Sequence, residues 1–141
     1  MNCYTYYEIA EGHVETFSVT ITEQMMFGFY DITGDCNPLH TDEDYAKKSG
    51  GDGFIGKVVY GMLTASFLST LAGVYLPGKH SLIHKSEAEF PVPVYVGDTL
   101  VFTGEIVNKN DSFRVIELKV TARNGAGKKV LRGKMRVGVL K

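Results

Sequence analysis

Residues 58–76 have the sequence VVYGMLTASFLSTLAGVYL, a run without a single charged side chain. An uncharged run of about 18 or more residues is formally a candidate for a transmembrane helix. Glycine, serine, threonine and tyrosine interrupt this one too often for a lipid-facing segment, and Pro77-Gly78 ends it. We therefore interpret it as a helix buried inside a domain, with no charged face to leave in water, and expect no membrane association.

The chain after this helix changes its period. Residues 82–90 alternate between apolar and polar side chains, which predicts a strand with one buried face. Longer strands are predicted over 99–108, 113–123 and 128–140, and the last two are joined by Asn-Gly-Ala-Gly at 124–127. This half is predicted to be an antiparallel meander. Because the uncharged helix needs cover, we expect the sheet to wrap it in an α+β architecture.

The first half is predicted to be mainly helical after a short extended piece at 14–19. Thr20 and the glutamate three residues later have capping-box spacing, which predicts a helix over about 22–33. A second, short helix is predicted with Thr41 as its N-cap and Gly50 just beyond its end. Its acidic first turn and its lysines in the last turn complement the helix dipole.

Length and composition favour one ordinary globular domain, 1–141. The chain has 141 residues, and its 15 Lys and Arg against 16 Asp and Glu give a net charge of -1, unlike the strongly basic balance of nucleic-acid-binding domains. Only two cysteines are present, Cys3 and Cys36, with no framework spacing, and the first residues lack the features of a secretion signal. We therefore expect a cytoplasmic protein that does not bind nucleic acid.

The densest group of chemically active side chains is Gly-Asp-Cys-Asn-Pro-Leu-His at 34–40. Pro38 forces the residue before it into an extended conformation, so the chain turns between Asp35 and His40 and can bring the two side chains together. A carboxylate and an imidazole beside one another could hold a water and move a proton near neutral pH. The same residues are also good turn formers, with Asp35 and Asn37 bonding to backbone amides. The spacing alone leaves both interpretations open.

Four segments of the chain together resemble a known family. The 34–40 motif, Tyr-Gly-Met-Leu-Thr-Ala-Ser at 60–66, Leu-Pro-Gly at 76–78 and Phe-Pro-Val-Pro-Val-Tyr-Val-Gly-Asp at 90–98 follow the order and spacing of the MaoC-like (R)-specific enoyl-CoA hydratases and dehydratases. The resemblance runs from about residue 20 to the C-terminus. It implies the hotdog fold, in which an antiparallel sheet wraps a central helix, and a homodimer.

The resemblance also implies roles for single residues. Asp35 and His40 fall on the pair that orients and activates water, and Asn37 falls on the asparagine of the same motif. Gly61 falls on the glycine whose backbone N–H holds the thioester carbonyl, a role suited to the positive end of a helix that begins there. Ser69 resembles the family's active-site serine, although Ser66 lies close and the sequence does not separate the two.

The implied reaction is the hydration of a trans-2-enoyl thioester of coenzyme A, or the reverse dehydration of an (R)-3-hydroxyacyl thioester, by a hydro-lyase without cofactor or metal. An acyl carrier protein could replace coenzyme A as the thiol carrier. Two alternatives stay open: a hotdog thioesterase, and a non-catalytic acyl-thioester-binding protein. An intact Asp35 and His40 argue against both.

Four further residues allow a plain structural interpretation. Tyr60 stands where most family members have histidine, and it either caps or packs the central helix or reshapes the substrate pocket. Cys36 is expected to be a packed small side chain rather than a nucleophile. His80 and His84 are four apart, a spacing that would suit a metal on a helix, but they lie in a strand pattern and are expected to be surface or packed residues.

Overall fold

A computed structural model describes residues 1–51 and 53–141. Its elements in chain order are η1 (Tyr6–Glu8), β1 (Val14–Thr20), α1 (Glu23–Thr33), α2 (Pro38–Thr41), α3 (Glu43–Ser49), α4 (Gly61–Thr70), the π-helical turn η2 (Leu71–Tyr75), β2 (Ser81–Glu89), β3 (Thr99–Asn110), β4 (Val115–Arg123) and β5 (Lys129–Val139). None of the helices among these residues has the length and apolar character that a membrane crossing requires.

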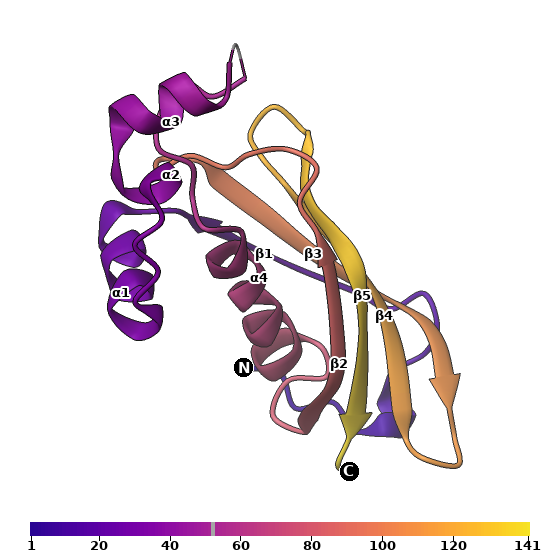
Figure 1. The fold of residues 1–141 in the computed structure, drawn as a ribbon. Coiled ribbons are helices and arrows are strands. Elements are labelled where there is room, and N and C mark those ends of the chain that lie inside the picture. The colour runs from indigo at the N-terminus through magenta and orange to yellow at the C-terminus, as the bar shows by residue number, and fades with distance from the viewer. Residues whose placement is uncertain (52) are drawn as a thin grey trace.

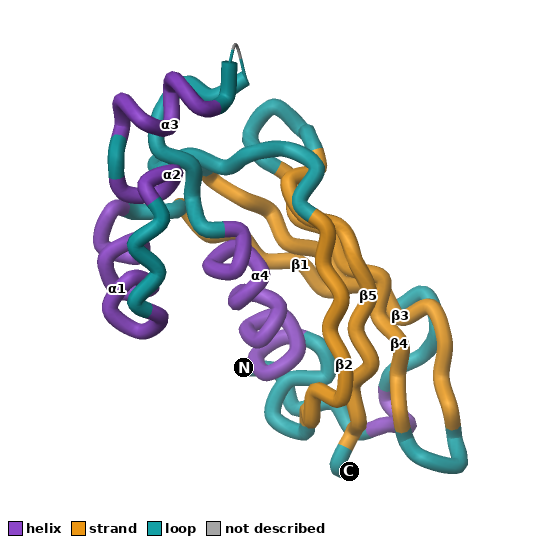
Figure 2. The backbone as a smooth tube through the Cα atoms, viewed as in Figure 1, coloured by secondary structure: helices purple, strands orange, loops and turns teal. Residues whose placement is uncertain are grey.

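The described strands form one five-stranded antiparallel sheet in the order β1-β3-β4-β5-β2. Figure 1 shows this curved sheet on one side of the molecule, with α4 along its inner face and α1 to α3 beyond one end. The α+β hotdog prediction is confirmed. The predicted meander is correct for β3, β4 and β5 but wrong for β2, which precedes them in the chain and pairs with β5 at the far edge (Figure 2). Alternation predicts a strand but does not identify the strand it pairs with.

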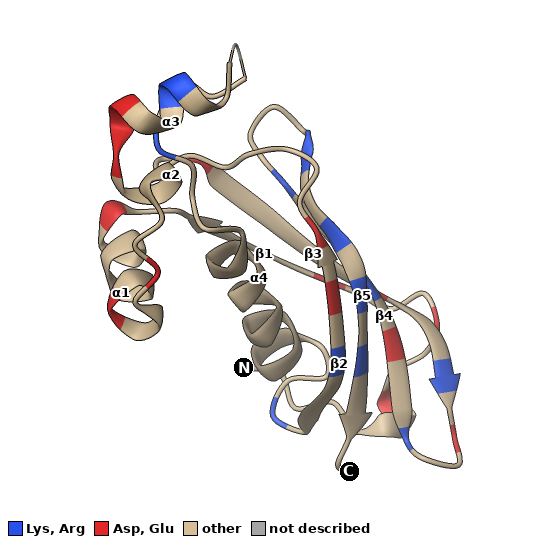
Figure 3. Ribbon diagram, viewed as in Figure 1, with Lys and Arg blue, Asp and Glu red and all other residues tan. Residues whose placement is uncertain are grey.

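The helix α4 packs one side against the sheet. Leu63 and Leu68 belong to the buried core, and the ring of Phe67 lies 5.6 Å from that of Phe102 on β3. Figure 3 shows that α4 carries no charged residue. The expectation that this helix is covered on all sides is nevertheless wrong for the single chain, because Met62 is 65% exposed at its surface. One uncharged face of α4 is therefore open.

The helix boundaries differ from the predicted ones at three places. The 58–76 run enters the fold as extended chain, because the Val59 N–H donates to Val94 O (2.8 Å), and α4 begins only at Gly61. The N-cap of α1 is Thr22, whose side chain accepts from the Met25 N–H, and not Thr20, which ends β1. Similarly, Asp42 and not Thr41 caps α3. Neighbouring threonine and aspartate residues can each serve as a cap, so sequence spacing leaves a shift of one or two residues.

The strand β2 is much more exposed than its alternating sequence predicts. Six consecutive residues, 82–87, are exposed, and Leu82 and Ile83 keep 50% and 39% of their surfaces accessible. The prediction of a buried face is therefore wrong for the single chain. The physical reason is position: within the described sheet β2 is an edge strand, with a neighbour on one side only.

Candidate active site

The 34–40 motif forms two successive Asx turns that lead into α2. Gly34 ends α1 with a φ of 68°, a left-handed conformation that glycine adopts without strain. Asp35 Oδ1 then accepts from the Asn37 N–H (3.0 Å), and Asn37 Oδ1 accepts from the Leu39 N–H (3.0 Å) and caps α2. Pro38 occupies the first turn of α2. The turn-forming interpretation of Asp35 and Asn37 is thus correct, and one carboxylate oxygen of Asp35 is left for other partners.

The short helix α2 presents His40 next to the strand-like segment that precedes α4. The Nδ1 atom of His40 lies 2.7 Å from Val58 O. A carbonyl oxygen only accepts hydrogen bonds, so Nδ1 carries the proton of this bond. In the neutral ring, Nε2 is then the unprotonated nitrogen, able to accept a proton from a substrate or a water.

Tyr60 is buried directly beside this motif. Its hydroxyl donates to the backbone oxygen of Asp35 (2.8 Å), and its ring centroid lies 4.2 Å from that of His40. Burial raises the pKa of Tyr60, and the nearby Asp35 charge raises it further, so the phenol keeps its proton and stays a donor at neutral pH. Tyr60 is the N-cap residue of α4 and is 2% exposed, so it packs at the start of the central helix, and it also lines the same cavity as Asp35 and His40, so both interpretations of this residue stay open.

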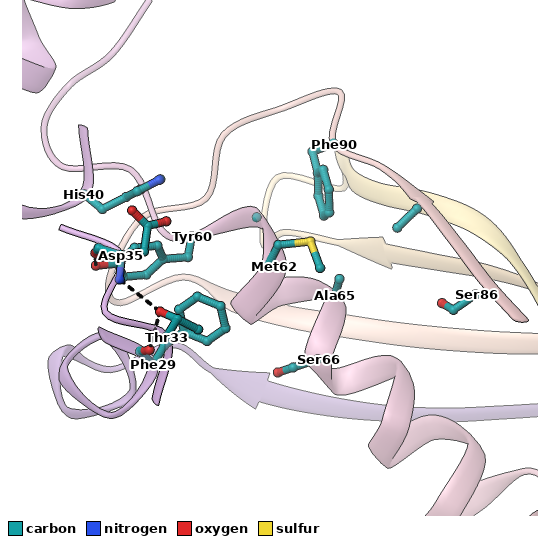
Figure 4. A pocket seen from close by; sticks show the side chains of 12 residues that line it. Phe29, Thr33, Asp35, His40, Tyr60, Met62, Ala65, Ser66, Ser86 and Phe90 are labelled. Atoms are coloured by element: carbon teal, nitrogen blue, oxygen red, sulfur yellow. Dashed lines mark hydrogen bonds between the residues drawn. The ribbon is translucent and has the colours of Figure 1, made fainter. Parts of the chain in front are cut away.

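Asp35, His40, Tyr60 and Gly61 line one cavity of about 850 Å³. Its other walls come from α1, α4, β2 and the residue that follows β2, and they are mainly apolar or small: Phe29, Thr33, Met62, Ala65, Ser66, Ser86, Ala88 and Phe90. Figure 4 shows the Asp35 and His40 side chains at one end, together with Tyr60, and Ser66 and Ser86 farther along. The arrangement places a carboxylate and an imidazole at the end of a largely apolar cavity, as an acyl group next to a polar reacting centre would require.

Gly61 begins α4 at this same end of the cavity. The first N–H that bonds back into the helix is that of Thr64, which donates to Tyr60 O (3.1 Å), so the Gly61 N–H lies outside the helical ladder. A Cβ added at Gly61 would lie 3.4 Å from the ring of Phe90, an ordinary contact distance. The backbone donor of a helix N-terminus is therefore available beside Asp35 and His40, where negative charge is stabilised.

Not all of the predicted site residues line the cavity. Ser66 lines the cavity, with its hydroxyl donating to Leu63 O (2.7 Å), whereas Ser69 is not among the described residues that line it. Asn37 acts on the backbone of α2 rather than in the cavity wall. Cys36 is exposed, so its predicted packed position is wrong. Among the described residues, no cluster of three His, Cys, Asp or Glu could hold a metal.

The contribution of β2 and of Phe90 just after it to the cavity was missed from the sequence. Ser86, Ala88 and Phe90 line it together. They occupy alternate positions of the 82–90 pattern, which therefore contained the signal for a shared face. Phe29 from α1 was also missed, because its position depends on how α1 lies against Tyr60, where the two ring centroids are 4.9 Å apart.

The sheet order, the helix against its inner face, and an Asp and a His beside that helix's first turn match the hotdog hydratase and dehydratase arrangement that the sequence resemblance implies. Residues 8–127 match the family described as MaoC like domain, and the chain belongs to this family.

The chain is also similar to individual proteins of known name. It is 32% identical to the (R)-specific enoyl-CoA hydratase of Rhodospirillum rubrum, over 94% of this chain and 89% of that protein. It is 31% identical to the 3-hydroxybutyryl-CoA dehydratase of Methylorubrum extorquens, over 85% of this chain and 75% of the relative. The solved structure of an (R)-hydratase from A. caviae involved in PHA biosynthesis superimposes with a TM-score of 0.85 at 27% identity, covering 93% of this chain and 97% of that one.

Proposed function

We propose that this protein is an (R)-specific enoyl-CoA hydratase, which adds water to a trans-2-enoyl thioester and also catalyses the reverse dehydration of an (R)-3-hydroxyacyl thioester. The observation that carries the proposal is the meeting of three groups in one cavity: the Asp35 carboxylate, the His40 imidazole and the first turn of α4 at Gly61. The named relatives, which include a hydratase and a dehydratase, support both directions of the reaction.

In the proposed mechanism, Asp35 and His40 hold one water molecule between them. Asp35 uses one carboxylate oxygen on the Asn37 N–H, and His40 uses Nδ1 on Val58 O. The second oxygen of Asp35 and Nε2 of His40 are then both acceptors, and each can take one O–H of the water. This leaves the lone pairs of the water oxygen directed at the β-carbon of the substrate, in the geometry that addition needs.

The protons of the proposed reaction balance without any cofactor. As the C–O bond forms at the β-carbon, the pair takes one proton from the water, and the electrons of the double bond move toward the thioester oxygen. The Gly61 N–H stabilises the negative charge that develops on that oxygen. A proton then passes from the pair to the α-carbon. The net result is one water added and the pair restored to its starting state.

The proposal predicts that the protein hydrates crotonyl-CoA to (R)-3-hydroxybutyryl-CoA. The loss of the conjugated thioester absorbance measures the rate, and chiral chromatography identifies the product. Running the same acyl group on an acyl carrier protein distinguishes the two thiol carriers. Release of free thiol instead of hydration would support the thioesterase alternative, and binding without turnover would support the non-catalytic one.

We also propose that the protein is a homodimer. Two open surfaces support this: the edge strand β2, where Ile83 is 39% exposed, and the uncharged face of α4, where Met62 is 65% exposed. Ile83 pairs with the buried Val137 and so lies on the inner face of the sheet, the face against which α4 packs. A second copy placed along β2 would extend the sheet and cover these apolar side chains.

The dimer proposal predicts a solution mass of twice the 15.5 kDa of one chain. Changing Ile83→Glu places a charge on the inner face at this edge and should shift the protein toward monomer at micromolar concentration. Leu82→Glu is the matched control, because Leu82 is 50% exposed but points to the outer face, and it should leave the dimer intact. Light scattering coupled to gel filtration measures both. A monomeric wild-type protein would contradict the proposal.

A further inference from the structure

We propose that Tyr60 is a positioning residue, which holds Asp35 and His40 at the separation that the water addition requires. This inference rests on the proposed hydratase function and deepens it. It is carried by two contacts that start from one side chain. The Tyr60 hydroxyl donates to the backbone oxygen of Asp35 (2.8 Å), and the Tyr60 ring lies against the imidazole of His40, with centroids 4.2 Å apart at 36°.

Among the residues that the structure describes, the loop 34–37 has one distant hydrogen bond, and Tyr60 donates it. Asp35 and Asn37 are exposed, and every other hydrogen bond of residues 34–37 within the described chain joins residues no more than four positions apart. The bond from Tyr60 crosses 25 positions. Local bonds define the shape of the turn, but they do not fix where the turn lies relative to the rest of the cavity. Tyr60 supplies this second constraint.

Tyr60 is itself well anchored. Its side chain is 2% exposed and belongs to the hydrophobic core, and the ring of Phe29 lies 4.9 Å from it on another side. Its backbone is the N-cap of α4, directly before Gly61. A single rigid side chain therefore connects the Asp35 loop, the helix of His40 and the start of α4. These are the three groups that the proposed mechanism uses.

The variant Tyr60→Phe removes the hydroxyl and keeps the ring. Because a displacement of about 1 Å at a reacting group can cost about 10²-fold in rate, we expect kcat to fall about 10-fold to 10²-fold while KM changes less than about twofold. In an Asp35→Asn background, Tyr60→Phe should add little further loss, since the group it positions is already disabled. The matched control is Tyr45→Phe, which removes a hydroxyl from an exposed residue on α3 and should leave kcat unchanged.

Hydrogen exchange measured by mass spectrometry tests the positioning role without any substrate. In Tyr60→Phe, the amides of residues 34–37 should exchange about fivefold faster or more than in wild type, with the β3–β4 hairpin unchanged. Unchanged exchange at 34–37, or a kcat equal to that of wild type, would overturn the inference. A wild-type protein inactive on every enoyl thioester would overturn the proposed function, and the exchange result would still decide whether Tyr60 holds the loop.

Discussion

Replacing Asp35 by Asn is expected to lower kcat for hydration of crotonyl-CoA by about 10²-fold to 10⁴-fold, the usual cost of removing a general acid or base. The asparagine keeps the Oδ1 acceptor for the Asn37 N–H, so the turn should persist while the charge is lost. His40→Ala is expected to cost a similar factor. The double variant should be little worse than either single one, because the two side chains act on the same water. Steady-state kinetics at high enzyme concentration measures all three.

Two control variants separate chemistry from folding in this experiment. Asp44→Asn removes a carboxylate from the first turn of α3, and His80→Ala removes an imidazole outside the cavity. Both should keep wild-type rates. Circular dichroism melts show whether Asp35→Asn and His40→Ala stay folded. If either folded variant retained more than about a tenth of the wild-type kcat, the assignment of the pair would be wrong.

The elements with strong periodicity could be predicted from the sequence, and their surroundings could not. The uncharged run and the alternating segments predicted a central helix and an antiparallel sheet, because burial imposes those patterns directly on the chain. The pairing of β2 with β5 and the open face of α4 depend instead on contacts between segments that are far apart in the sequence. A strand such as 82–90 shows the same alternation whether its apolar face is covered by its own chain or left at an edge.

In the candidate site, too, local features could be predicted from the sequence and long-range contacts could not. Asp35 and His40 were candidates from local sequence because Pro38 constrains the chain between them, and the family resemblance, not the spacing, assigned them as a catalytic pair. The bond from Tyr60 to Asp35 joins backbone to side chain across 25 positions, and no local pattern signals it. Ser66 and Ser69 could not be separated because they are three residues apart on one helix and so lie on neighbouring parts of its surface. Only the full fold shows that Ser66 is in the cavity wall and Ser69 is not.

Gly61→Pro is expected to lower kcat by about 10²-fold to 10³-fold, the usual effect of losing one oxyanion donor. Proline removes the backbone N–H at the first position of α4, where the helix ladder does not need it. The residue before it is already extended, with φ −53° and ψ 123° at Tyr60, which is compatible with a following proline. The fold should therefore survive a change that removes the proposed donor.

Gly61→Ala separates the loss of the N–H from the effect of an added side chain. Alanine keeps the donor, and its Cβ would meet the Phe90 ring at 3.4 Å without a clash. We therefore expect Gly61→Ala to lose much less of kcat than Gly61→Pro, with any cost falling mainly on KM through the narrowed cavity. Equal losses of kcat in the two folded variants would mean that space beside Phe90, and not the backbone N–H, is what the reaction needs from this glycine. The pair of variants thus distinguishes charge stabilisation from shape at one position.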